Sequence, residues 1–142
     1  MTDEPNRPVR RTEPESFRAR KSSASLTVKD LQVSLAWYRD VLGFHVGQVY
    51  EREGRPVAVA LKAGAVELLL GQDDGAKGID REKGQGFSLQ FTTAQSIDSI
   101  AKRVRAHGGM LASEPADMPW GVRVFRLRDP DGFTLVISSE KP

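Results

Sequence analysis

An internal repeat is the feature that most constrains the fold of this chain. Residues 25–28, Ser-Leu-Thr-Val, match residues 88–91, Ser-Leu-Gln-Phe, and a helical pattern that ends at Gly43 matches one that ends at Gly108. Both matches need a nearly constant shift of 63 to 65 residues. Because repetition at a fixed distance marks copies of one supersecondary unit, the sequence predicts two modules of the same topology.

Each module has the pattern of one strand, one helix and three further strands. The strands show period-2 alternation or short apolar runs between glycine turns, and the helices show apolar residues at 3.6-residue spacing. In the first module we expect a strand over 24–28, a helix over 30–43 and strands over 44–52, 56–62 and 65–71. In the second module we expect a strand over 87–91, a helix over 96–107 and strands over 110–115, 121–128 and 132–138.

The domain organisation follows from this repeat. A chain of 142 residues suits one folding unit. We expect one domain over 22–139, made of modules 22–74 and 86–139, with a glycine-rich charged linker or mobile lid over 75–85. Residues 1–21 are rich in proline and charge, which predicts a flexible arm whose end extends the first strand or reaches a partner subunit.

Composition excludes several classes of function. The chain has no cysteine, which removes disulfides, thiolate nucleophiles and cysteine-ligated metals. It has no apolar run near the roughly 20 residues of a membrane span and no secretory signal, so we expect a cytoplasmic protein. The net charge of +2 lies in residues 1–21, because residues 22–142 hold fifteen basic and fifteen acidic residues. A neutral body without a basic, aromatic surface motif argues against nucleic-acid binding.

Three stretches carry a family resemblance: "VKDLQVSLAWYRDVLGF", "AVELLL" and "DPDGFTLVI". With the repeat, they make residues 22–139 similar to the vicinal oxygen chelate superfamily, which includes glyoxalase I, bleomycin-resistance proteins and extradiol dioxygenases. The resemblance implies an α+β fold in which tandem βαβββ modules form an open cup-shaped mixed sheet with helices on the outside. It also implies a homodimer, since many members of the family are dimeric.

The resemblance further implies where metal ligands would stand. The four positions fall on Ser23, Glu67, one residue of 86–89 for which alternation favours Ser88, and Val136. Only Glu67 is a metal-binding residue, and divalent metals in such sites need several His and carboxylate ligands. His45 and His107 lie away from these positions, where we expect a surface and a helix-terminus histidine. We therefore expect no metal and no cofactor.

The expected ligand is a small molecule held on the inner face of the cup. Strand parity places small polar side chains there, which leaves room for a guest. Trp37 suits helix packing or a dimer contact better than ligand binding. Trp120, in the loop "DMPWG", suits ligand contact as well as it suits a structural role. The candidate ligand-binding residues are Ser23, Ser25, Glu67, Ser88, Gln90, Trp120 and Val136.

Glu67 has two interpretations. It pairs with a strand arginine such as Arg123 or Arg126, or it anchors a ligand and, with a pKa raised by burial, acts as a general base. The Asp129-Pro-Asp-Gly turn has a structural interpretation, because proline fixes φ and glycine accepts positive φ in a tight hairpin.

Three hypotheses of function result. The first is a metal-independent, dimeric protein that sequesters an aromatic or amphipathic compound, in the manner of bleomycin-resistance proteins. The alternative is a lyase or isomerase that uses Glu67 as its base or sole metal ligand. The third is a regulatory or accessory subunit whose cup is filled by its own side chains.

Overall fold

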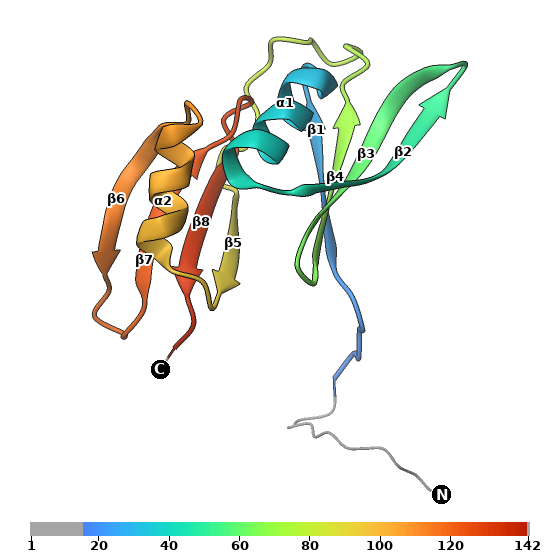
Figure 1. Ribbon diagram of the computed structural model, residues 1–142. Helices are drawn as coiled ribbons and strands as arrows, with labels where there is room; N and C mark the ends of the chain where they lie inside the picture. Colours follow the sequence, from blue (N-terminus) through green and yellow to red (C-terminus); the bar gives the residue numbers. More distant parts are fainter. Residues whose placement is uncertain (1–15, 142) are drawn as a thin grey trace, which may run out of the picture.

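The computed structural model describes residues 16–141, and these fold into the two predicted modules (Figure 1). The first module consists of β1 (Ser23–Val28), α1 (Leu31–Trp37), η2 (Tyr38–Leu42), β2 (His45–Arg52), β3 (Arg55–Ala63) and β4 (Val66–Gln72). The second consists of β5 (Ser88–Thr93), α2 (Ile97–Ala106), β6 (Leu111–Asp117), β7 (Arg123–Arg128) and β8 (Thr134–Ser139). The boundaries predicted from periodicity agree with these to within about two residues.

Each module forms one four-stranded mixed sheet. The strand orders are β1-β4-β3-β2 and β5-β8-β7-β6, so the repeat extends to topology. In both sheets the first strand of the module pairs in parallel with the last, and the remaining pairs are antiparallel. The α+β class and the tandem βαβββ arrangement are confirmed. We refer to the two sheets as the first sheet and the second sheet.

The first helix begins and ends at residues suited to those positions. The Asp30 side chain accepts hydrogen bonds from the backbone N–H groups of Gln32 and Val33, which caps α1. The helix continues into the π-helical turn η2, where the Gly43 N–H donates to the carbonyl of Tyr38, five residues earlier. It stops at Gly43, whose φ of 84° is in the left-handed region that glycine adopts without a steric penalty.

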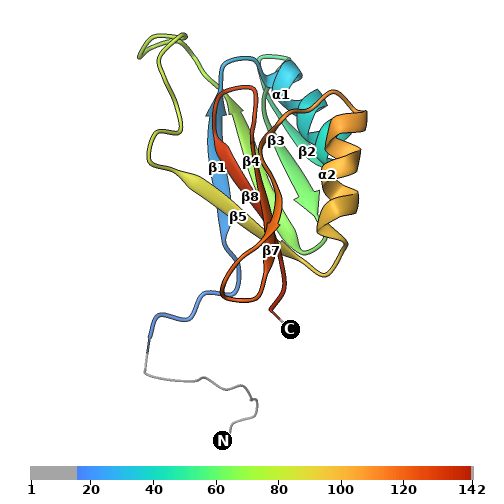
Figure 2. The same cartoon turned by 90° about the vertical axis from the view of Figure 1, so that its left-hand side faces the viewer.

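One hydrophobic core joins the two modules. It contains alternate side chains of both sheets together with apolar residues of α1, η2 and α2, and α2 packs against η2. Both sheets thus turn their apolar faces toward the helices (Figures 1 and 2). Among residues 16–141 no helix covers the opposite face of either sheet, and this face points away from the core (Figures 1 and 2). We call these the bare faces.

The Asp129-Pro-Asp-Gly turn ties the second module to the first. Asp129 Oδ1 accepts the N–H groups of Asp131 and Phe133, and Asp129 Oδ2 accepts the Tyr38 hydroxyl of η2 at 2.7 Å. Asp131 accepts the Lys29 N–H at 2.7 Å. The hairpin expected from sequence is confirmed, and its two carboxylates also join the modules.

The segment between the modules is held by buried charges. The Lys83 side chain is 6% exposed, and its Nζ lies 3.2 Å from Asp73 at the end of β4 and 3.5 Å from Asp131. Arg81 forms a second ion pair with Asp73 at 2.7 Å. The N–H of Gly75 and the Lys83 and Arg81 cations hold the pKa of Asp73 below its usual range. The end of this segment is therefore clamped to both modules.

The arm predicted over 1–21 falls mostly outside the described residues. Residues 16–22 precede β1 and contain no strand, so they do not extend it as proposed. None of the helices within residues 16–141 has the length and hydropathy of a membrane span.

Candidate functional site

The bare face of the first sheet carries a polar row across all four strands. Ser23 of β1 is paired with Glu67 of β4, Glu67 with Lys62 of β3, and Lys62 with His45 of β2. Residues directly opposite each other on neighbouring strands share a face of the sheet. Next to this row, the exposed Ser25 lies opposite Leu69. His45 is thus an exposed bare-face residue, separated from Glu67 by Lys62.

Glu67 already has partners within the chain. The Ser23 hydroxyl donates to Glu67 Oε1 at 3.0 Å, and Lys21 Nζ lies 2.8 Å from the same oxygen. These two contacts, the Lys21 interaction being the larger, hold the pKa of Glu67 below its usual range. A general base at this position would need a pKa raised by burial, and the lowered pKa of Glu67 contradicts that expectation.

The expectation that Glu67 pairs with a strand arginine is also wrong, because its cationic partner in the chain is Lys21. Arg123 lies on the helix-covered face of β7, where it binds Asp98 of α2 and Asp117 of β6. Lys21, just before β1, takes the place of that arginine because the parallel pairing of β1 and β4 brings it to Glu67.

The bare face of the second sheet has two aligned rows. Ser88 of β5 lies opposite Thr134 of β8, which lies opposite Arg128 of β7. In the next row Gln90 lies opposite Val136, which lies opposite Arg126. The structure therefore brings together three of the predicted residues: Ser88, Gln90 and Val136.

Val136 stands in an apolar patch on this face. It is 6% exposed and packs with Val122 and Val124, with Met118 against them. Trp120 lies in the same loop as Met118 and Val122, between β6 and β7, and is 61% exposed. The loop thus adds a large exposed ring to the same end of the sheet, and exposed aromatic rings of this kind commonly contact apolar ligands. Trp37, in contrast, packs against the core and contacts the Tyr38 ring edge-on, as helix packing predicts.

The four positions implied by the resemblance do not form a metal-binding set. Glu67 is engaged by Lys21 and Ser23, Val136 offers no donor atom, and Ser88 offers a neutral hydroxyl. No group of three or more His, Cys, Asp or Glu side chains in residues 16–141 is placed to hold a metal ion. His107 caps α2, and its Nδ1 lies 2.9 Å from the Arg103 carbonyl, as expected for a helix-terminus histidine. The donor set does not fit a divalent metal.

The predicted residues divide between the two bare faces. Ser23, Ser25 and Glu67 belong to the first sheet, whereas Ser88, Gln90 and Val136 belong to the second. Because both sheets share one core on their other faces, one chain does not enclose these two groups in a common cavity. The period-2 alternation of each strand assigned these strand residues to the correct face of their sheet. It gave no information on how the two sheets lie relative to each other.

Two arginines on the second bare face were not predicted as site residues. Neither the Arg126 nor the Arg128 guanidinium has a hydrogen bond or ion pair to any residue in the described part of the chain, and both side chains are exposed. Their separation by two in β7 was a usable signal, since alternate residues of a strand share a face.

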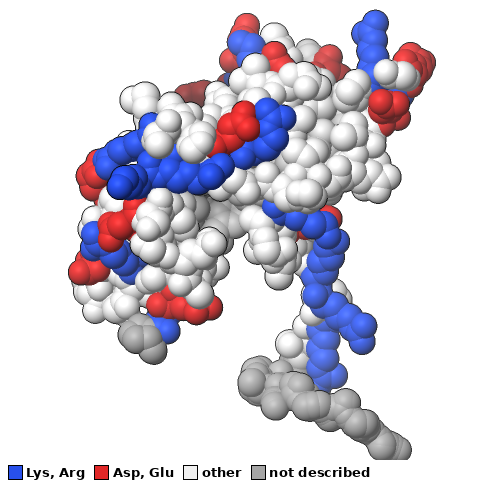
Figure 3. Space-filling view, viewed as in Figure 1, with Lys and Arg blue, Asp and Glu red and all other residues white. Residues whose placement is uncertain are grey.

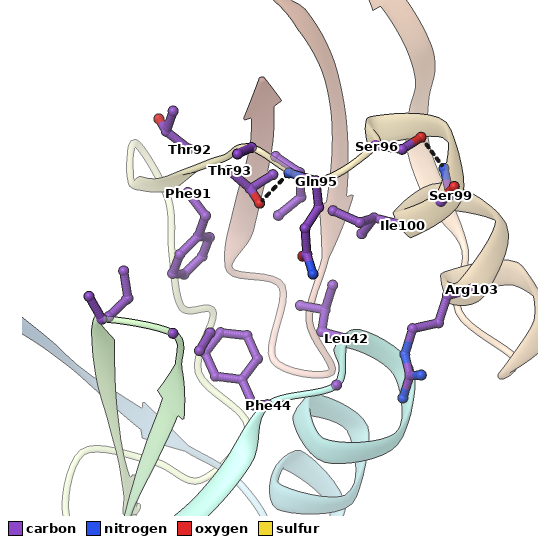
Figure 4. A pocket seen from close by; sticks show the side chains of 17 residues that line it. Leu42, Phe44, Phe91, Thr92, Thr93, Gln95, Ser96, Ser99, Ile100 and Arg103 are labelled. Carbon is purple, nitrogen blue, oxygen red and sulfur yellow. Dashed lines mark hydrogen bonds between the residues drawn. The ribbon is translucent and has the colours of Figure 1, made fainter. Parts of the chain in front are cut away.

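Two cavities accompany these surfaces. An open cavity of about 840 Å³ lies beside Ser88, Arg128 and Thr134, with residues 80–87 as its other wall. A second, of about 760 Å³, lies on the helix side, in the hollow between the modules that Figure 3 shows with few charged side chains. Its floor includes Phe44 and Phe91, in edge-on contact, and Arg103 and Gln95 lie at its rim (Figure 4). The predicted site residues do not line this second cavity.

Comparison with known proteins agrees with this architecture. Residues 22–137 match the family model described as the Glyoxalase/Bleomycin resistance protein/Dioxygenase superfamily. No curated protein matches the sequence significantly.

Three solved structures illustrate the similarity. A member of that superfamily from Sphaerobacter thermophilus DSM 20745 is 25% identical, with a TM-score of 0.69, over 87% of this chain and 98% of the other. TioX from Micromonospora sp. ML1 is 18% identical, with a TM-score of 0.71, over 85% and 98%. TnmS3, an antibiotic binding protein from Streptomyces sp. CB03234, is 19% identical, with a TM-score of 0.68, over 89% and 100%.

Proposed function

Because the chain belongs to the Glyoxalase/Bleomycin resistance protein/Dioxygenase superfamily, we propose that it is a metal-independent protein that binds a small aromatic or amphipathic molecule. The observation that carries this proposal is Val136. At the position where the resemblance implies a metal-binding carboxylate, the chain has a valine buried in an apolar patch on the bare face. This patch offers nothing to a metal ion, and the exposed Trp120 in the loop that supplies Val122 provides a ring on which an apolar guest can pack. TnmS3, with the same fold, is an antibiotic binding protein, which supports a binding role of this kind.

The cup is proposed to be shared by two copies of the chain. Each bare face is half of a binding surface, and the two halves lie away from one shared core in a single chain. In a homodimer with two-fold symmetry, the first sheet of one copy can oppose the second sheet of the other, which produces two equal cups. Ser23, Ser25 and Glu67 would then face Ser88, Gln90, Trp120 and Val136 of the other copy.

The alternatives have less support. A lyase or isomerase with Glu67 as base needs a carboxylate that takes up a proton near neutral pH, whereas Lys21 and Ser23 hold the pKa of Glu67 low. An accessory subunit with a filled cup needs bulky inward side chains, whereas the bare face of β1 exposes Ser23, Ser25 and Thr27. The cytoplasmic location stays a prediction.

A complementation experiment tests the shared cup. Tryptophan at the exposed Ser25 (Ser25→Trp) fills the first bare face, and Gln90→Trp fills the second, so each homodimer should lose binding of the neutral fluorescent probe N-phenyl-1-naphthylamine. In a mixed dimer, both substitutions fall in one cup and the other cup is unaltered. We expect the purified mixed dimer to recover half the binding capacity of the unmodified dimer, measured by fluorescence titration.

The controls concern folding and assembly. Each variant should remain a dimer by light scattering and unfold at the temperature of the unmodified protein, since both positions are exposed. A monomeric unmodified protein that still binds the probe, or a mixed dimer with no recovery, would contradict the shared cup.

A further inference from the structure

Arg126 and Arg128 form an unpaired cationic group beside the apolar patch of the second bare face. Both guanidinium groups lack a described partner, and both are on the face that carries Val136. Most other arginines of the second module are engaged on the helix side: Arg123 with Asp98 and Asp117, Arg105 with Glu114, and Arg103 with the Asp40 carbonyl. Two unpaired cations thus lie together on the surface proposed to bind a ligand.

The cavity beside Arg128 strengthens this observation. Its other basic residues are already neutralised, because Arg81 pairs with Asp73 and Lys83 pairs with Asp73 and Asp131. Its Asp80 pairs with Lys29. Arg128 is therefore the basic residue of this cavity that has no ion pair among the described residues, and the Ser88 and Thr134 hydroxyls lie in its row.

The spacing suits one oxyanion. Alternate residues of a strand are about 7 Å apart, a distance that two long arginine side chains can close around a single carboxylate, phosphate or sulfonate group. Guanidinium groups bind such groups through paired N–H donors, and the hydroxyl and amide side chains of Ser88, Thr134 and Gln90 can add further donors. The patch around Val136 lies directly beside this position and suits an apolar body.

We propose that the ligand is an amphipathic anion, whose oxyanion group is bound by Arg126 and Arg128 and whose aromatic or aliphatic body packs on the exposed Trp120, at the edge of the patch formed by Val122, Val124 and Val136. This inference rests on the proposed binding function and specifies the charge of its ligand. It assigns the second bare face the larger part of recognition.

A pair of matched probes tests the charge. The anionic 8-anilino-1-naphthalenesulfonate and the neutral N-phenyl-1-naphthylamine share an aromatic body and differ in the sulfonate. We expect Arg126→Gln and Arg128→Gln each to weaken binding of the anionic probe roughly tenfold, the loss typical of a hydrogen bond to a charged group, with little change for the neutral probe. Arg52→Gln, at the exposed end of β2, is the matched control and should change neither affinity.

Further variants keep the test decisive. Arg126→Lys retains the charge without the paired donors, so its affinity for the anionic probe should be intermediate. This variant also tests the inference if Arg126→Gln fails to fold. Competition by benzoate and by phenyl phosphate identifies the preferred oxyanion. If neither displaces the anionic probe better than the uncharged benzyl alcohol does, the inference is overturned.

The outcomes separate this inference from the proposed function. If the unmodified protein binds neither fluorescent probe, the proposed function fails and the inference with it. If it binds both and the arginine variants bind the anionic probe as tightly as the unmodified protein does, only the inference fails. A shift from dimer to monomer in Arg126→Gln with unchanged probe affinity would show that the arginine pairs with the other copy, which also overturns it.

Discussion

Lys83→Met is expected to lower the free energy of unfolding by about 3 kcal/mol. The Lys83 ammonium is almost fully buried between Asp73 and Asp131, so methionine leaves two carboxylates without this cation. Loss of one partner of a buried ion pair typically costs about 3–5 kcal/mol, and the lower end applies because Arg81 still compensates Asp73. Urea denaturation followed by circular dichroism measures the change.

Lys102→Met is the matched control for this prediction. Lys102 is an exposed residue of α2 without a described ion pair, so the same substitution should alter the free energy of unfolding by less than about 0.5 kcal/mol. Equal stability of the Lys83 and Lys102 variants would show that the segment between the modules is not clamped by buried charge.

Asp129→Ala should destabilise the protein by at least about 3 kcal/mol, because three donors lose their acceptor. The Tyr38 hydroxyl and the N–H groups of Asp131 and Phe133 all donate to this carboxylate, and Tyr38 is fully buried. Burial raises the pKa of Asp129, so its ionised form depends on these hydrogen bonds. Chemical denaturation of the variant gives the change in free energy.

A double-mutant cycle isolates the contact between the modules. Asp129→Asn keeps an amide oxygen for the two backbone N–H groups and should cost only about 1 kcal/mol. Tyr38→Phe removes the hydroxyl alone, and combining it with Asp129→Asn gives the coupling between η2 and the turn. Additive effects of the two substitutions would contradict a direct role of this hydrogen bond in joining the modules.

The fold was largely predictable from the sequence because its signals are local and repeated. Gly43 and Gly108 end the two helical patterns, and period-2 alternation identified β1 and β5 with the correct faces. The π-helical turn η2 was not predicted, since a change from α- to π-type hydrogen bonding leaves the apolar spacing nearly unchanged. The roles of Asp129 and Asp131 between the modules were missed because turn chemistry alone explained these residues.

The site was predictable only in part. The alternation of side chains along each strand identified the face that carries Ser23, Ser25 and Glu67 in the first sheet. It did the same for Ser88, Gln90 and Val136 in the second. It could not show that these faces point away from a common core, because that depends on how α2 packs on η2. The partner of Glu67 was wrongly assigned, since Lys21 lies before β1 in a segment read as a flexible arm.

Metal content measured together with probe binding tests the central claim most directly. The protein is purified without chelator, its divalent metals are quantified by elemental analysis, and N-phenyl-1-naphthylamine is titrated before and after dialysis against EDTA. We expect no stoichiometric metal, the same metal content in Glu67→Gln, and an affinity for the probe that EDTA leaves unchanged. One divalent ion per chain that is lost in Glu67→Gln, with probe binding abolished by EDTA, would contradict a metal-independent binding protein.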